Sequence, residues 1–346
     1  GYLDWKTQFY KTYHPLIGHF LDTTPRRDDF DRIRWGSTDS SLLHPLNFPD
    51  FIPQQETDYL AADDLIYGFR IDGEPYAVPR FMLFPHEMLN TTLHDRVLCL
   101  SLCTMCNSPI LYDRTVNGQP LQFGNTGLIW RGNKAMYDEE TRSLWNQQTG
   151  TPIAGPMLEQ VQTGSGDMSL EFLPVTQTEW REWHADYPDT RVLAPDTSYD
   201  YDYDFYRDYQ GFIKRQYWEN PAVTHPGVAP SNEDLSDQTY VYSVAAVDGA
   251  HVYPVDAVRE QEPITDTIDG DDVVVVTESG DVAVYVAPPL PVSREGDELI
   301  DAEDTAWRIT HDGLWHDDTV QRRITGRHGL WLATRPHYDT YIIIES

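Results

Sequence analysis

Lysine is scarce in this 346-residue chain, which has 25 basic residues but only four lysines: Lys6, Lys11, Lys134 and Lys214. Acidic residues number 56, so the formal net charge at pH 7 is −31. Nucleic acid binding is disfavoured, because no stripe of Lys and Arg could neutralise phosphates. An acidic, lysine-poor surface suits concentrated salt, where a Debye length of about 3 Å at 1 M screens the self-repulsion. The composition predicts a halophilic source; an acidic face that binds cations or basic partners is the alternative.

Long apolar runs are also missing. No window reaches the ~18 consecutive apolar residues that a membrane span needs. The start, GYLDWKTQFYKTYHPL, has neither a basic n-region nor an apolar h-region, so we expect no intact signal peptide here, although a leader already removed is compatible with it. Hydrophobic residues at 40% and aromatic residues at 12% indicate a folded protein.

Cysteines are few, and all three lie within eight residues, at Cys99, Cys103 and Cys106. A disulfide framework would be spread along the chain, so the cluster indicates chemistry at one place. Haem attachment would need a histidine after the second cysteine of the Cys-x-x-Cys pair, and Asn107 stands there. No Gly-Lys-Ser/Thr follows the glycine-rich stretch FGNTGLIWRGN, so no nucleotide signal is present. Three alternatives stay open for the pair: a metal site, a reversible disulfide and a purely structural turn.

Strand patterns dominate the sequence. DLIYGFRIDGEPYAVPR reads as two strands around Asp72-Gly73, RVLCLSL as a buried strand, and PILYDRTVNGQPLQFGN as a hairpin that turns at Asn117-Gly118. TQTEWREWHADYP is the best helix candidate of the first half, ended by Pro188. SYDYDYDFYRDYQGF alternates tyrosine and aspartate, a pattern that fits a strand with one aromatic face, although an acidic surface loop is the favoured interpretation.

The second half repeats the first in reduced form. TYVYSVAAVDGAHVYPVDAV parallels DLIYGFRIDGEPYAVPRFML, with Asp248-Gly249 in the place of Asp72-Gly73. We therefore predict an α+β, β-rich fold of two related strand-rich subdomains that arose by internal duplication and pack together. The expected divisions are an N-terminal extension (1–40), a first copy (41–215), a connection (216–238) and a second, degenerate copy (239–346).

A transition-metal site is the leading interpretation of the cysteine turn. One Cys-x-x-Cys supplies two ligands, and His86, seventeen residues before Cys103, is the best candidate for a third. Copy two has the short turn ESGD in place of CTMCNSP, and Glu262 falls where His86 stands when the glycines are matched, so the histidine and the cysteines are absent together. Thiolate and imidazole ligands favour copper or zinc. Glu87 and Asp138 are candidates for groups that orient the ligands or act as acid or base.

The same residues resemble a known family. The stretches that carry the resemblance cover about residues 42–212 and include HEMLN, CTMC, MYDEE and SLWNQQTG. They are similar to the prokaryotic family known as domain of unknown function 3179, whose motifs include His-Glu-x-x-Asn-Asp, Tyr-Cys-Pro-Leu-Cys, Met-Tyr-Asp and Ser-Leu-Trp. Residues that match these motifs are His86, Glu87, Asn90, Cys103, Cys106, Met136, Tyr137, Asp138, Ser143, Leu144 and Trp145, whereas Thr91, Leu102 and Thr104 depart from them.

The resemblance implies an exported protein of bacteria or halophilic archaea and no established activity. We therefore expect a copper- or zinc-binding extracytoplasmic or cell-surface protein that could work as a redox enzyme; a cytoplasmic location stays open. The alternative is a structural cell-surface protein that self-associates through strand edges, for which the apolar tail YDTYIIIES is the candidate segment.

Overall fold

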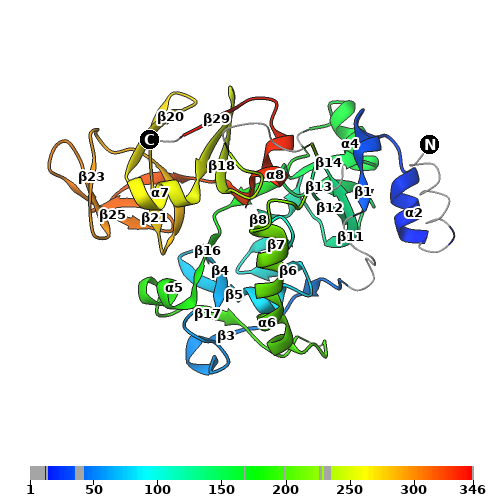
Figure 1. Cartoon of the computed structure of the whole chain (residues 1–346), viewed down its shortest axis with the longest axis horizontal. Helices are drawn as coiled ribbons and strands as arrows, with labels where there is room; N and C mark the ends of the chain where they lie inside the picture. The colour runs from blue at the N-terminus through cyan, green and yellow to red at the C-terminus, as the bar shows by residue number, and fades with distance from the viewer. Residues whose placement is uncertain are drawn as a thin grey trace.

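The computed structural model describes residues 12, 15–35, 43–166, 168–197, 199–225, 228–229 and 235–344. Its strands form several sheets, so the expectation of a strand-rich fold is confirmed (Figure 1). No helix in these ranges is long and apolar enough to cross a membrane. The α-helices are short: α2 (Pro15–Asp22), α3 (Arg80–Leu83), α4 (Pro156–Gln162), α5 (Trp180–Asp186), α6 (Tyr203–Ile213), α7 (Val255–Gln261) and α8 (Trp331–Thr334). The 3-10 helices η1 (Phe30–Arg32), η3 (Gln54–Glu56) and η5 (Arg335–His337) and the π-helix η4 (Lys214–Trp218) accompany them.

Three five-stranded sheets and a small hairpin build the first half. The first sheet has the order β16 (Thr176–Glu179), β4 (Leu65–Ile71), β5 (Glu74–Pro79), β17 (Arg191–Leu193), β3 (Phe51–Pro53). The second has the order β15 (Glu171–Leu173), β8 (Ser108–Asp113), β7 (Arg96–Cys103), β6 (Met88–Leu93), β2 (Leu46–Asn47). The third has the order β1 (Arg34–Trp35), β11 (Phe123–Trp130), β12 (Asn133–Asp138), β13 (Leu144–Asn146), β14 (Thr151–Ala154), and the hairpin pairs β9 (Thr115–Val116) with β10 (Gln119–Pro120).

Two sheets build the second half. One has the order β28 (Arg327–Leu330), β18 (Tyr240–Ala246), β19 (Gly249–Pro254), β29 (Tyr341–Ile343). The other has the order β20 (Ile264–Ile268), β21 (Asp271–Glu278), β22 (Asp281–Val286), β27 (Thr319–Ile324), β26 (Gly313–His316), β25 (Ala306–Thr310), β24 (Glu298–Ile300), β23 (Ser293–Glu295). The apolar tail is thus a strand of its own chain, parallel to β19 at one end of a sheet.

The halves follow the same order of elements. In each, an antiparallel hairpin leads through a short helix to a three-stranded antiparallel meander: β4-β5-α3-β6-β7-β8 in the first half and β18-β19-α7-β20-β21-β22 in the second. The hairpin strand β4 pairs antiparallel with β16, as β18 does with β28. The strand after the following helix, α5 or α8, then lies parallel to the second hairpin strand.

A constant shift of 175 residues relates these elements. It takes β4 at 65–71 to β18 at 240–246, β5 at 74–79 to β19 at 249–254, and β7 at 96–103 to β21 at 271–278. The second hairpin turns at Val247 and Asp248, because Ala246 pairs with Gly249. The alignment that matched Gly73 with Gly249 was therefore wrong by one residue. With the shift of 175 residues, Glu262 corresponds in position to Glu87 and not to His86.

Some local expectations were wrong. Residues 203–213 of the tyrosine–aspartate stretch form the helix α6. Asp202 caps its N-terminus, because its carboxylate accepts a hydrogen bond from the backbone N–H of Phe205. Its aromatic residues recur every three or four positions and stack along the helix, as Phe205, Tyr209 and Phe212 do. The predicted helix TQTEWREWHADYP is confirmed in its second part, where Trp180–Asp186 is α5, whereas its first part, Thr176–Glu179, is strand β16. The described part of segment 1–40 packs on the first half, since β1 pairs with β11 and the ring of Phe20 lies 4.9 Å from that of Tyr137.

Candidate functional site

The two paired cysteines lie at the turn between β7 and β8. Strand β7 ends at Cys103, which pairs with Ser108, and the turn between them holds four residues, whereas the turn between β21 and β22 holds two. Asn107 adopts a left-handed conformation with φ of 48°, a conformation that asparagine tolerates better than most residues. The turn brings the Cα atoms of Cys103 and Cys106 to 5.2 Å, and the two residues form a disulfide.

One side of this disulfide is closed by the second half of the chain. Leu330, at the end of β28, donates its backbone N–H to the carbonyl oxygen of Cys106 over 2.8 Å. The side chains of Leu330, Leu332 and Ala333 form an apolar cluster with the two cysteines. Cys106 is fully buried there, whereas Cys103 keeps 6% of its surface exposed.

The other side of the disulfide faces a small pocket of about 80 Å³. The walls are apolar apart from one ion pair and one hydroxyl, and the lining residues are Leu43, Glu87, Cys103, Thr104, Met105, Gly127, Leu128, Ile129 and Lys134. Cys103 and not Cys106 lines this pocket. The two sulfurs therefore differ in access: one borders a cavity and the other is enclosed.

A buried ion pair stands in the pocket wall. The Lys134 ammonium lies 3.2 Å from one carboxylate oxygen of Glu87 and donates to the backbone oxygens of Glu87 (2.9 Å) and Leu102 (3.1 Å). The other oxygen of Glu87 accepts from the hydroxyl of Thr104 (2.5 Å) and from its N–H (3.3 Å). Burial lowers the pKa of Lys134, while the neighbouring carboxylate of Glu87 opposes that shift and favours the charged ammonium. The pair connects the Cys-x-x-Cys turn, through Thr104, to the segment between α3 and β6.

Sequence reasoning selected Glu87 but missed Lys134. A signal for Lys134 was available, because it is one of only four lysines in a strongly acidic chain and lies within the strand pattern NKAMYD. Its side chain is only 6% exposed. A lysine is rarely buried without a specific partner, so its position in a strand core pointed to a site.

His86 lies beside Glu87 in the chain, but its ring is bonded elsewhere. Nδ1 lies 2.7 Å from the carbonyl oxygen of His44, so it carries the proton and donates it, and Nε2 accepts from the hydroxyl of Tyr203 at 3.1 Å. The rings of Tyr199 and Tyr201 lie 5.1 and 5.0 Å from the imidazole. Burial lowers the pKa of His86 to about 4, so the ring is neutral at pH 7. Both ring nitrogens have partners other than the cysteines.

Asp138 holds a turn together at a different place. Its carboxylate accepts hydrogen bonds from the indole N–H of Trp145 (2.8 Å), the hydroxyl of Thr141 (2.8 Å), and the backbone N–H groups of Thr141 and Ser143. In the second half of the chain, Asp301 accepts a hydrogen bond from the indole N–H of Trp307 at 2.9 Å. Asp138 does not line the cysteine pocket, and its contacts are those of a turn-stabilising residue; an acid or base role stays a prediction.

The third cysteine, Cys99, is enclosed within the sheet. It is fully buried and unpaired. Burial raises the pKa of its thiol to about 12, so it stays protonated and unreactive near neutral pH.

Copper or zinc binding by His86, Cys103 and Cys106 stays a prediction. Among the residues that the structure describes, no three His, Cys, Asp or Glu side chains are grouped so as to hold a metal ion. The thiolates that a metal requires would exist only after the disulfide is reduced. His86 would in addition have to give up its bond to Tyr203.

Comparison with known proteins extends the resemblance along the chain. No curated protein and no solved structure matches the chain. One family does match, and the match covers residues 44–341, so it includes both halves and not only the segment 42–212 on which the motifs lie. The chain therefore belongs to the family described as protein of unknown function DUF3179.

Proposed function

We propose that Cys103 and Cys106 form a thiol–disulfide redox centre. The observation that carries this proposal is the unequal access of the two sulfurs: Cys103 borders a pocket, while Cys106 is enclosed by Leu330 and its neighbours. A dithiol that exchanges with a substrate needs one accessible sulfur to attack and a second, protected one to resolve the mixed disulfide.

The exchange would proceed in two steps. In the reduced protein, the thiolate of Cys103 attacks one sulfur of a substrate disulfide, forming a mixed disulfide, and the other substrate sulfur leaves as a thiolate that takes up a proton. The Cys106 thiolate then attacks the sulfur of Cys103, which restores the protein disulfide and releases the second substrate thiol. Two electrons thus pass from the protein dithiol to the substrate disulfide, and the reverse sequence oxidises a substrate dithiol.

Lys134 and Glu87 are the residues of the pocket wall that would tune this reaction. A nearby cation favours a thiolate over a thiol and lowers the pKa of the attacking cysteine. Lys134 lines the same pocket as Cys103 and is held by Glu87 and two backbone oxygens. We assign Lys134 the stabilisation of the Cys103 thiolate, and Glu87 the positioning of Lys134 and of the turn through Thr104.

The test is the reactivity of the cysteines in the folded protein. After mild reduction and removal of the reductant, we expect an iodoacetamide-type reagent to modify Cys103 faster than Cys106 and to leave Cys99 unmodified. Lys134→Met should raise the pKa of the reactive thiol, whereas the control Lys214→Met should not, because Lys214 lies on the surface with a side chain 59% exposed. Equal reactivity of Cys103 and Cys106, or no reactivity before unfolding, would contradict the proposal.

A copper or zinc centre is the second candidate. It is supported by the position of two cysteines on one turn, since reduction would leave two thiolates on residues whose Cα atoms are 5.2 Å apart. His86 would join them only after a change of its ring contacts. Elemental analysis of reduced protein and of the Cys103→Ser/Cys106→Ser variant tests this: stoichiometric metal in the parent and none in the variant supports the centre, and metal in neither removes it.

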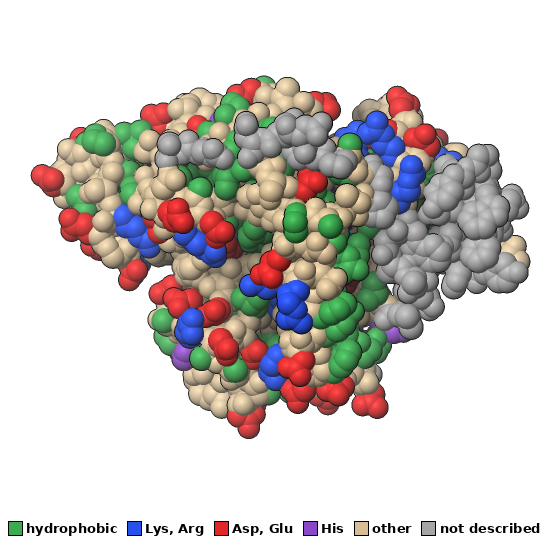
Figure 2. Space-filling view, viewed as in Figure 1, with side chains coloured by type: hydrophobic (Ala, Val, Ile, Leu, Met, Phe, Trp, Pro, Cys, Tyr) green, Lys and Arg blue, Asp and Glu red, His purple; other side chains and the backbone are tan. Residues whose placement is uncertain are grey.

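We also propose the kind of organism and the location in which the protein works. The acidic excess fits a halophilic, extracytoplasmic protein, and acidic side chains are scattered over the face shown in Figure 2. The rival function, self-association on a cell surface, is supported by the position of β29 at the end of its sheet, which leaves an edge for pairing. Dimerisation that is lost after Ile342→Lys would favour this rival.

The shared order of elements supports an origin of the two halves by duplication. Under this proposal the constant shift of 175 residues makes Glu278 the counterpart of Cys103, and the two additional residues of the first copy's turn accommodate Cys106. The redox centre would then be a property of the first copy alone.

A further inference from the structure

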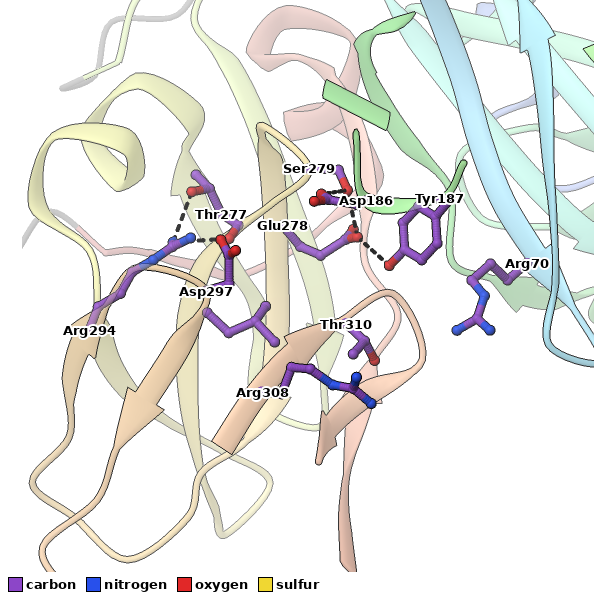
Figure 3. A pocket seen from close by; sticks show the side chains of 11 residues that line it. Arg70, Asp186, Tyr187, Thr277, Glu278, Ser279, Arg294, Asp297, Arg308 and Thr310 are labelled. Carbon is purple, nitrogen blue, oxygen red and sulfur yellow. Dashed lines mark hydrogen bonds between the residues drawn. The ribbon is translucent and has the colours of Figure 1, made fainter. Parts of the chain in front are cut away.

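A second, larger cavity lies where the two halves meet. Its volume is about 380 Å³, within the range of small-molecule sites. Arg70, Asp186 and Tyr187 reach it from the first half, and Figure 3 shows them facing residues of β21, β25 and the β23–β24 turn. Glu278, at the end of β21, stands on its wall, at the position that Cys103 has at the end of β7.

The carboxylate of Glu278 is fully occupied by protein donors. The hydroxyl groups of Tyr187 and Ser279 donate to one oxygen at 2.8 Å each, and Thr176 donates to the other at 3.2 Å, with Arg323 at 3.7 Å. Burial alone would raise the pKa of Glu278, but His311, Arg323 and Ser279 lower it to about 2. Glu278 therefore links the two halves through its hydrogen bonds to Tyr187 and Thr176. The charged groups that would contact a ligand are other residues of the cavity.

Two arginines face the open part of the cavity from different halves. Figure 3 shows the guanidinium groups of Arg70 and Arg308 directed toward the same space below the ring of Tyr187. Arg70 pairs with Asp312 and donates to the carbonyl oxygen of Gly73 at 2.7 Å, but its Nε is buried without a hydrogen-bond partner. Arg308 is exposed, and its side chain makes no hydrogen bond or ion pair with the residues that the structure describes, although its backbone pairs within the sheet. Each guanidinium therefore has N–H groups that could donate to a ligand. A planar guanidinium can bind a carboxylate through two parallel hydrogen bonds.

Acidic groups lie on the other walls. A carboxylate oxygen of Asp186 lies 2.6 Å from the hydroxyl oxygen of Ser279, so Asp186 and Glu278 compete for the single proton of that hydroxyl. Burial and the nearby carboxylates of Glu278 and Asp297 raise the pKa of Asp186. Asp297 lies on the side away from Arg70, nearer Arg294, which itself is paired with Glu262. The cavity is thus cationic toward Arg70 and Arg308 and acidic at the opposite walls, which favours a ligand with a carboxylate at one end and a donor group at the other.

We propose that this cavity binds a small organic acid, with its carboxylate between Arg70 and Arg308 and a hydroxyl or ammonium group toward Asp186 and Asp297. The site is separate from the disulfide and would give the junction between the two halves a binding function. Its ligand contacts come from both halves, so occupancy would also hold the halves together.

Calorimetric titration of the full chain at constant ionic strength tests the proposal, with glutamate, malate and succinate as probes and inorganic phosphate as the competing oxyanion. We expect glutamate or malate to bind more tightly than succinate and phosphate. Arg308→Ala should weaken that binding by at least tenfold, because a charge-assisted hydrogen bond contributes about 1.5–3 kcal/mol. Arg322→Ala is the matched control, since Arg322 is exposed, pairs with Asp271 and does not line the cavity.

The result can overturn the proposal in three ways. No binding of glutamate or malate at 10 mM would remove the site. Equal affinity of the Arg308→Ala and Arg322→Ala variants would show that Arg308 does not contact the ligand. Tighter binding of phosphate than of any carboxylate would show that the cavity prefers another oxyanion to an organic acid. The Arg308→Ala variant should fold, because the side chain is exposed, and an unchanged circular dichroism spectrum checks this.

Discussion

Replacing Lys134 by methionine should destabilise the folded protein strongly, because the change leaves the carboxylate of Glu87 buried without its cation. The ammonium is 6% exposed and lies 3.2 Å from a carboxylate oxygen of Glu87, whose side chain is 15% exposed. Removing one partner of a buried pair leaves an uncompensated charge, at a cost of about 3–5 kcal/mol. This is a large part of the ~5–15 kcal/mol by which domains are stable.

The double variant Glu87→Gln/Lys134→Met separates the charge effect from lost packing. It removes both charges, and methionine retains much of the apolar length of lysine, so we expect it to recover at least half of the loss. Unfolding by guanidinium chloride at pH 7 in constant salt, on both single variants and the double, gives the coupling energy. The control Lys214→Met should change the free energy of unfolding by less than about 0.5 kcal/mol.

The single variant Lys134→Met should also change the reduction potential of the disulfide. Without the cation, the Cys103 thiolate loses stabilisation, so the reduction potential should become more negative, by some tens of millivolts, since 30 mV corresponds to about 1.4 kcal/mol. A loss of stability below 1 kcal/mol, together with an unchanged potential, would refute the role that we assign to Lys134.

Three further predictions concern pH, salt and the disulfide. Burial lowers the pKa of His86 to about 4 from an ordinary value near 6.5. The contribution of the neutral ring to stability is therefore complete above pH 6.5 and is lost as the pH falls toward 4, by about 3 kcal/mol. His86→Gln should make the free energy of unfolding less dependent on pH between 6.5 and 4. With a net charge of −31, the melting temperature should rise steeply between 0.1 and 2 M KCl, and a flat response would contradict the halophilic interpretation. Because Cys103 and Cys106 are three positions apart, the loop is short, and Cys103→Ser/Cys106→Ser should cost about 2 kcal/mol by chain entropy, measured by denaturant unfolding under oxidising conditions.

Local sequence signals predicted the hairpins well because their turns depend on few residues. The Asp72-Gly73 pair does form the tight turn between β4 and β5, and both residues have positive φ. The second hairpin shows the limit of that reasoning: Asp248-Gly249 has the same letters, but the turn falls at Val247 and Asp248. The choice of register depends on which residues of β18 and β19 reach the core, and the dipeptide alone does not contain that information.

The site was predicted in part. The sequence identified the Cys-x-x-Cys turn and Glu87, but it also placed the ring of His86 beside the cysteines. Glu87 has a positive φ of 53°, and its side chain reaches Thr104 and Lys134, whereas the ring of the preceding residue packs among tyrosines of the segment 199–203. Proximity in sequence does not fix the direction in which a side chain points. The contact of His86 with Tyr203, 117 positions away, was not available to local reasoning.

The central claim is that Cys103 and Cys106 exchange electrons while the protein stays folded. Equilibration in graded redox buffers, followed by alkylation and mass spectrometry of the peptide that contains both residues, measures it directly. The account predicts a reversible two-electron transition of the folded protein at a potential between about −120 and −270 mV, the range of redox-active protein disulfides. A pair that stays oxidised below about −300 mV, or that is reduced only when the protein unfolds, would contradict the claim and make the disulfide structural.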